Sequence, residues 1–123
     1  MSDWPSEIRL SKDRRTLTVS FEGGESHELP AELLRVESPS AEVQGHGPSQ
    51  KRIVPGKREV EILKVEPVGN YAVRLTFDDM HDTGIFGWDY LRLLGREREA
   101  KMAAYLAALD EQGLSRERPS ARR

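Results

Sequence analysis

Residues 81–95, HDTGIFGWDYLRLLG, decide how this chain folds, because they join a polar loop to a strand end and then to a helix. Ile85 and Phe86 form a short apolar run that we expect to be buried as the end of a strand. Gly87 follows as an acceptable N-cap residue, and Asp89 falls in the first helical turn, where the helix dipole favours a carboxylate. The stretch therefore predicts a strand that leads directly into a helix.

The predicted helix carries apolar side chains on one face. Trp88, Leu91 and Leu94 recur at helical spacing. Tyr90 lies beside this series, and Gly95 is expected to end the helix. Because Trp88 is large and stands where the strand meets the helix, we interpret it as an anchor of the hydrophobic core.

Five further stretches predict strands, because apolar and polar residues alternate in them or β-branched and aromatic residues are frequent. They span Glu7–Leu10, Thr16–Phe21, Glu25–Leu29, Val60–Val65 and Tyr71–Phe77. The first three are joined by short polar or glycine-containing links and form an antiparallel meander. The last two are separated by a turn at Gly69–Asn70, which predicts a hairpin. One side of the last strand carries Tyr71, Val73, Leu75 and Phe77.

A short helix is predicted after the third strand. Pro30 suits its first turn, because the N–H that proline lacks would have no helical partner there. The helix covers residues 30–38, PAELLRVES, and we expect Leu33, Leu34 and Val36 to pack inward.

A longer helix is predicted over residues 95–113, which are rich in the helix-forming residues Ala, Leu, Met, Glu, Arg and Lys. Its apolar stripe consists of Met102, Leu106 and Leu109, with Tyr105 alongside. This stripe is expected to face the sheet, and Gly113 is expected to end the helix.

These elements predict an α+β fold. It is a small β-rich domain of antiparallel strands, with a short helix after the third strand and an amphipathic helix near the C-terminus. We assign residues 1–113 to this domain, and we predict a disordered basic tail over residues 114–123.

The composition limits the chemistry of the chain. Its 123 residues include no cysteine, which excludes disulfides, thiolate zinc sites and cysteine nucleophiles. Charged residues make up 33%, but the formal net charge is −2, so no global basic excess attracts nucleic acid. No apolar run approaches the ~20 residues of a membrane span, and the N-terminus lacks the features of a signal peptide. We therefore expect a cytoplasmic protein without a membrane partner.

Residues 37–58 separate the two groups of strands and are rich in Ser, Gly and Pro. Long loops of this kind are functional or mobile, and we expect a flexible surface excursion. Its last part, KRIVPGKR at residues 51–58, holds four cations that form either a solvated loop or a local basic patch. Nucleic-acid binding through this patch and the basic tail is not favoured, because no aromatic residue interleaves with the cations.

His81 lies among three acids, Asp78, Asp79 and Asp82. Imidazole and carboxylate groups together could hold a divalent metal ion. An acid beside a histidine also orients the ring of a general base. A loop between a strand and a helix equally uses Asp and His to form turns and a polar surface. The residues alone leave these three interpretations open, and the structural one is the simplest.

Two stretches resemble a known family. Residues 36–47, VESPSAEVQGHG, and residues 81–95 are similar to small domains related to the N-terminal domain of gamma-butyrobetaine hydroxylase. The resemblance rests on the motif H-x-T-G-I-[FY]-x-W-D-Y-L and covers roughly residues 6–113. Besides His81, its structural positions are Gly84, Trp88, Asp89, Tyr90 and Leu91. The family includes stand-alone bacterial proteins of unknown function and fusions to P-loop ATPases of iron–sulfur cluster assembly, and the resemblance implies a compact β-rich domain.

The resemblance also implies the position of a structural zinc site, which the hydroxylase forms with three cysteines and one histidine. The cysteine positions match Ser38, Ser40 and Val43, and the histidine position matches His81. A serine hydroxyl does not ionise near neutral pH, valine has no donor atom, and one imidazole cannot hold a structural zinc. We therefore predict a degenerate site without metal or cofactor. Ser38 and Ser40 would form hydrogen bonds in the loop, with His81 as a structural residue in the same pocket.

A different metal site is the alternative. His46 lies in the loop that faces His81 in the family arrangement. These two histidines, together with Asp79 or Asp82, would form a ligand set without thiolates.

The first function hypothesis is a non-catalytic binding or adaptor module with a protein partner. The chain is too short for the dioxygenase domain of the hydroxylase, none of its three histidines is followed by x-Asp or x-Glu, and it has no Walker loop. By analogy with the family's fusions, the partner would be an iron–sulfur carrier ATPase. The alternatives are a small metal-binding domain, or an enzyme that uses His81 with Asp79 or Asp82 as base and orienting acid.

Overall fold

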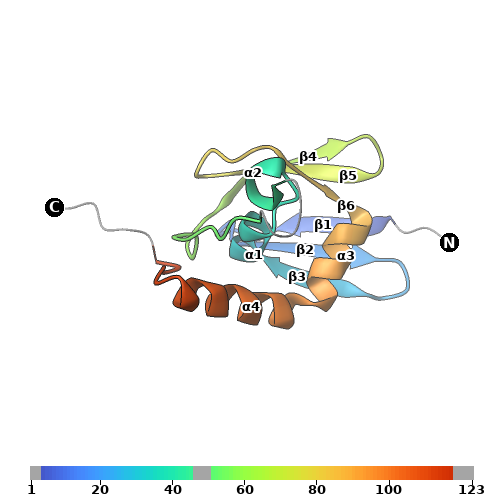
Figure 1. The fold of residues 1–123 in the computed structure, drawn as a ribbon. Coiled ribbons are helices and arrows are strands. Elements are labelled where there is room, and N and C mark those ends of the chain that lie inside the picture. The colour runs from blue at the N-terminus through green and yellow to red at the C-terminus, as the bar shows by residue number, and fades with distance from the viewer. Residues whose placement is uncertain (1–3, 46–50, 118–123) are drawn as a thin grey trace.

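The computed structural model describes residues 4–45 and 51–117. Within these ranges, six strands form two antiparallel sheets, with the orders β1-β2-β3 and β4-β5-β6. Figure 1 shows the second sheet above the first, with α3 crossing in front of the first sheet and α4 running along its lower side. No helix in the described ranges is long and apolar enough to cross a membrane. The predicted α+β class is confirmed.

The first sheet is the predicted meander. Its strands are β1 (Pro5–Leu10), β2 (Thr16–Phe21) and β3 (Ser26–Pro30). Alternation along β2 places Leu17, Val19 and Phe21 on the buried face, because successive side chains of a strand point to opposite sides. Leu17 pairs in register with Leu29 of β3, which is also fully buried, so the two strands contribute to one apolar face.

The second sheet contains the predicted hairpin and one further strand. Its strands are β4 (Ile62–Val68), β5 (Ala72–Phe77) and β6 (Gly84–Gly87). Val73, Leu75 and Phe77 are buried, as their alternation predicts. Tyr71 does not continue this series: it is 60% exposed. Its N–H donates to Val68 O, which places Tyr71 in the turn before β5 rather than in the strand.

Strand β6 corrects the prediction that two neighbouring apolar residues are both buried. Phe86 is fully buried, whereas Ile85 pairs with Arg74 on the outer face of the sheet and is 44% exposed. A strand directs adjacent side chains to opposite faces, so only one of the two can enter the core.

The main core is shared by both sheets and by two helices, α1 (Ala31–Val36) and α3 (Trp88–Arg96). Leu33 and Leu34 of α1 and Leu91 and Leu94 of α3 are all fully buried. Trp88 is half-buried against this core, and its indole N–H donates a hydrogen bond of 2.9 Å to a backbone carbonyl of the β4–β5 turn. The helix start therefore joins the second sheet to the core.

Gly95 lies inside α3 rather than at its end, since the helix continues to Arg96. A Cβ atom at position 95 would lie closer than 3.0 Å to three atoms of His27 in β3. The predicted role of Gly95 as a helix stop is therefore wrong. The glycine instead allows α3 to approach β3 closely.

Helix α4 (Arg98–Glu111) contacts α1 and α3. Its buried residues, Tyr105 and Leu109, form a small second cluster with Val36 of α1. Leu106, which the sequence predicted to face the sheet, is 38% exposed. The buried face of the helix follows Tyr105 and Leu109, which are four residues apart, and this face turns Leu106 towards solvent.

The end of α4 forms a Schellman motif, which confirms the predicted stop at Gly113. This residue has φ 67°, in the left-handed region that glycine adopts without strain. The Leu114 N–H donates to Leu109 O at 2.8 Å, and the Gly113 N–H donates to Asp110 O at 3.1 Å. Of the predicted disordered tail, residues 114–117 make specific contacts with the domain, and residues 118–123 lie outside the described residues.

The expectation of a flexible excursion over residues 37–58 is wrong for the part before residue 46. The short helix α2 (Ala41–Gln44) forms there, and Ser38 and Val43 are buried. A loop with few apolar residues can be buried when its hydroxyl and backbone groups find hydrogen-bond partners, and the Ser38 hydroxyl finds one in His81 of the loop after β5.

Candidate functional site

Backbone hydrogen bonds hold the loop after β5 in a fixed shape. The Phe77 N–H donates to His81 O at 2.9 Å, and the Met80 N–H donates to Phe77 O at 3.0 Å. Met80 has φ 73°, which reverses the chain between these two bonds. The His81 N–H donates to Asp79 Oδ1 at 3.1 Å. These bonds position His81 so that only 7% of it is exposed.

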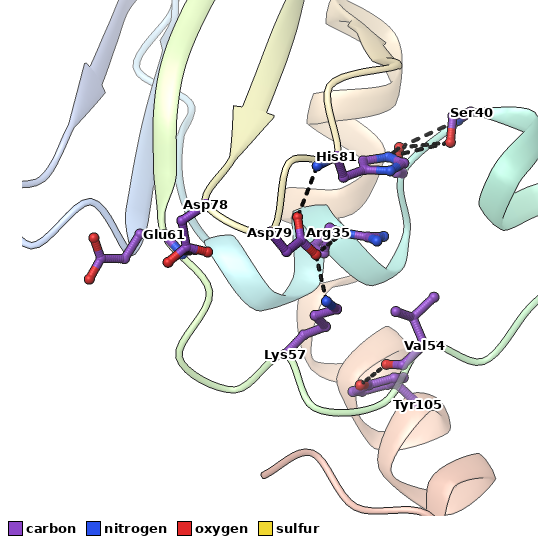
Figure 2. Close-up of polar contacts among 10 residues, drawn as sticks. Arg35, Ser40, Val54, Lys57, Glu61, Asp78, Asp79, His81 and Tyr105 are labelled. Atoms are coloured by element: carbon purple, nitrogen blue, oxygen red, sulfur yellow. Dashed lines mark hydrogen bonds and ion pairs between the residues drawn. The ribbon is translucent and has the colours of Figure 1, made fainter. Parts of the chain in front are cut away.

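The imidazole of His81 lies against two serines that follow α1, and we call Ser38, Ser40 and His81 the serine–histidine cluster. Ser38 Oγ lies 2.9 Å from His81 Nε2, and Ser40 Oγ lies 3.4 Å from the same nitrogen. Ser38 is fully buried and Ser40 is 8% exposed. Figure 2 shows the ring pointing towards Ser40. The structure thus brings together three of the four positions that the resemblance assigned to a degenerate metal site.

Val43, the fourth position, is 1% exposed and belongs to α2. The four positions offer two neutral hydroxyl groups and one imidazole, and Val43 offers no donor. A structural zinc is held by four nitrogen, sulfur or carboxylate donors in a tetrahedral arrangement. These residues therefore do not fit the zinc of the hydroxylase, and a hydrogen bond to Ser38 engages His81 Nε2 instead.

Gly84, at the start of β6, allows the serine–histidine cluster to form. A Cβ atom at position 84 would lie closer than 3.0 Å to Ser38 Oγ, a distance that real Cβ atoms essentially never show. The loop after α1 can approach β6 this closely only because the residue there has no side chain. This contact gives a physical reason for the glycine of the motif.

Asp79 interacts with two cations rather than with the imidazole. Its Oδ2 accepts a hydrogen bond of 2.7 Å from Arg35 Nε and lies 2.6 Å from Lys57 Nζ, as Figure 2 shows. Burial raises the pKa of Asp79, but hydrogen bonds from Lys57, the His81 N–H and Arg35 outweigh it and hold the pKa at about 2. Through Oδ1, Asp79 contacts the backbone of His81 and thereby orients the loop.

The alternative metal site is not assembled by the described residues. His46 lies outside them, Asp82 is exposed, and Asp79 is engaged by Arg35 and Lys57. Across residues 4–45 and 51–117, no group of three or more His, Asp or Glu side chains could hold a metal ion. The site of His46 and His81 with Asp79 or Asp82 stays a prediction.

The cations of residues 51–58 are largely paired with acids. Lys51 pairs with Glu37 at 2.7 Å, Lys57 pairs with Asp79, and Arg58 pairs with Glu117. A cation that is already neutralised contributes less to the field that attracts phosphate groups. This pairing is further reason not to favour nucleic-acid binding through the loop.

The roles of Arg35 and Lys57 and the partner of Tyr90 were not predictable from the sequence. The Tyr90 hydroxyl donates to Glu37 O at 2.5 Å, and burial, with the nearby Glu37 charge, raises the pKa of Tyr90 to about 12. This bond fastens α3 to the end of α1, just before the serine–histidine cluster. The partners are far apart in the chain, so no local pattern could have identified them.

The fold and the buried cluster define a small α+β domain in which the segment after the first helix is fastened to the loop before a WDYL helix. The chain belongs to the family described as gamma-butyrobetaine hydroxylase-like, N-terminal, whose model matches residues 8–92. This range contains the serine–histidine cluster and Gly84 and ends within α3. The family resemblance inferred from the motif is thereby confirmed.

Several solved structures are similar to this chain over most of its length. Two solution NMR structures share 49% and 41% sequence identity with it; the alignments cover 96% and 99% of this chain and 93% and 92% of theirs, each with a TM-score of 0.81. A crystal structure of a protein of unknown function of the DUF971 family, from Acidithiobacillus ferrooxidans, shares 43% identity over 76% of this chain and 93% of its own, with a TM-score of 0.63. No curated protein matches the chain. The family is thus that of an uncharacterised domain, with no identified enzyme class.

Proposed function

We propose that this domain is a non-catalytic docking module that binds a protein partner. The observation that carries the proposal is that neighbouring side chains engage both the imidazole of His81 and the carboxylate of Asp79. His81 Nε2 is hydrogen-bonded to Ser38, and the Asp79 carboxylate is held by Arg35 and Lys57. A buried polar network of this kind fixes the positions of the segments that it joins. The network therefore shapes the domain, and the protein partner is recognised by residues on the surface of the domain.

The partner that the family resemblance favours is a P-loop ATPase that carries iron–sulfur clusters. Members of the family are fused to such ATPases, and a stand-alone domain would perform the same docking between separate chains. This part of the proposal rests on analogy between family members.

Affinity capture tests the proposal. The tagged full-length protein is used as bait in an anaerobic extract of cells that produce it naturally, with a tagged unrelated domain of similar size and charge as the control. We expect a P-loop iron–sulfur carrier to be enriched on the bait and to bind again when both proteins are purified. Repeated capture without any such ATPase, or failure of the two purified proteins to bind each other, would contradict the proposal.

A further inference from the structure

The segment after α4 runs beside the loop that precedes β4. In Figure 1 the segment is red and the loop is green. The Gly56 N–H donates to Ser115 O, and the Arg58 N–H donates to Arg116 O, both at 2.9 Å. These two bonds fasten the backbone of the segment to the backbone of the loop, and the segment bends at residues 116 and 117 rather than running as a strand. The segment Leu114–Glu117 is therefore attached to the domain as a bound peptide would be.

Arg116 anchors this segment to a buried acid. Its Nε donates to Glu32 Oε2 at 3.1 Å, and its Nη2 donates to Glu32 Oε1 at 2.5 Å. Glu32 lies in the first turn of α1 and is only 5% exposed. Within residues 4–45 and 51–117, the hydrogen bonds of this carboxylate come from Arg116 alone. A buried carboxylate needs such a partner, and the planar guanidinium matches both of its oxygens at once.

The segment makes few other contacts, and the side chains that make them are more exposed to solvent than Glu32. Arg58 forms an ion pair with Glu117, and both side chains are about half exposed. Leu114 is 39% exposed. A cavity of about 330 Å³ lies beside the segment, lined by Pro55, Gly56, Gly113, Leu114, Ser115 and Glu117. The Arg116–Glu32 pair is therefore the main cost of releasing the segment, and a partner's arginine that takes the place of Arg116 would offset that cost while the core stays folded.

We propose that Glu32 and the loop at residues 55–58 form a binding site for a peptide segment that contains arginine, and that residues 114–117 occupy this site within the same chain. The inference rests on the docking function proposed above and adds the kind of partner segment that is recognised. The Glu32 carboxylate selects the arginine, and the N–H groups of Gly56 and Arg58 bind the peptide backbone. Residues 114–117 compete with the partner's peptide for this site, so the partner must bind tightly enough to displace them.

The test uses the full chain with Arg116→Ala and Glu117→Ala, which removes both ion pairs of the segment. The probe is the acetylated and amidated peptide GLSRE, residues 113–117, followed by NMR through the amide signals of Gly56 and Arg58. We expect the peptide to bind this variant at least ~10-fold more tightly than it binds the wild-type chain, because the internal competitor is weakened. The peptide GLSAE should bind at least ~10-fold more weakly than GLSRE, because it lacks the guanidinium.

Two matched controls separate the site from general charge effects. Glu32→Gln in the same background should abolish binding of GLSRE. Arg74→Ala in the same background removes an exposed arginine that is paired with Glu66 within the second sheet, and it should leave peptide binding unchanged. The proposal is overturned if millimolar GLSRE leaves the two amide signals unmoved, or if GLSRE and GLSAE bind equally.

Hydrogen exchange of the wild-type chain gives a second measurement, which stands even if the double variant does not fold. The amides of Gly56 and Arg58 should exchange at least ~100-fold faster than the amide of Ile62, whose hydrogen bond to Arg14 O joins β4 to the link between β1 and β2. Equal protection would show that the segment does not open on its own and would overturn the proposal. Neither result depends on the capture of an ATPase. If the peptide site is disproved, the docking function is still tested by affinity capture.

Discussion

Gly84 and Ser38 lie so close together that no side chain fits between them: a Cβ atom at position 84 would lie within 3.0 Å of Ser38 Oγ. Ser38 is fully buried and hydrogen-bonded to His81, so it has little room to move. We expect Gly84→Ala to lower the free energy of unfolding by about 1–3 kcal/mol, as overpacking of an interior does. Urea denaturation at neutral pH measures this change.

Two controls test whether the hydroxyl of Ser38 is the cause. In a Ser38→Ala background, the effect of Gly84→Ala should be smaller by at least ~0.5 kcal/mol, because the clashing atom is gone. Gly87→Ala in the same strand should change stability by less than about 1 kcal/mol, since its Cβ would meet only Tyr71 O, at 3.8 Å. An identical effect of Gly84→Ala in both serine and alanine backgrounds would rule out this explanation.

Restoring the three thiols should create a zinc site. The chain with Ser38→Cys, Ser40→Cys and Val43→Cys is expected to bind about one zinc ion per molecule, with His81 as the fourth ligand. The wild-type chain is expected to bind none at micromolar free zinc, because its hydroxyls do not ionise. Equilibrium dialysis with metal analysis of tag-free protein measures both.

The control for the zinc experiment is His81→Ala in the three-cysteine chain, which should weaken zinc binding clearly. If the three-cysteine chain holds no more zinc than wild type, these positions do not correspond to a zinc site. Zinc bound by the wild-type protein would contradict the prediction that the site is degenerate.

Asp79 should make the stability of the protein depend on pH in the acid range. Its pKa is lowered from 3.8 to about 2 in the folded chain, so the stabilisation is complete above about pH 4 and is lost as the pH falls towards 2. Asp79 is partly screened by solvent, and we expect it to contribute roughly 1–2 kcal/mol at neutral pH. Urea denaturation of wild type and Asp79→Asn should give a difference in the free energy of unfolding that shrinks below pH 4. The control is Asp82→Asn at an exposed position, which should show no such loss. A difference that is constant from pH 7 to pH 2 would exclude the ion pairs as its source.

The two leucines of α4 should differ strongly in their contribution to stability. Leu109 is 3% exposed and packs with Val36 and Tyr105, so Leu109→Ala should lower the free energy of unfolding by about 2–4 kcal/mol. Leu106 is 38% exposed, and Leu106→Ala should lower it by less than about 1 kcal/mol. Thermal or urea unfolding measures both, and comparable losses would mean that α4 presents a different face to α1.

The elements with a clear period were predictable from the sequence. The alternation of Val73, Leu75 and Phe77 and the motif at residues 81–95 each depend on neighbours within one strand or one turn. The resemblance correctly grouped Ser38 and Ser40 with His81, because a motif carries information about distant contacts that periodicity does not.

The remaining contacts depend on residues that only the tertiary fold brings together. The pairing of Asp79 with Arg35 and Lys57 joins three separate segments and follows no local pattern. Helix α2 has four residues, too few for a periodic signal, and its stability comes from packing. Gly95 has the residue type of a helix stop, and only the position of His27 shows why it lies inside α3.

The serine–histidine cluster joins the loop after α1 to the loop after β5 using oxygen and nitrogen atoms alone. The resemblance implies thiolates at the corresponding positions of the hydroxylase, and thiolates are lost to peroxide and to thiol-alkylating reagents. Here neither kind of reagent finds a sulfur atom at the junction, because the chain contains no cysteine. The hydrogen bonds of the junction consequently do not depend on thiols being kept reduced.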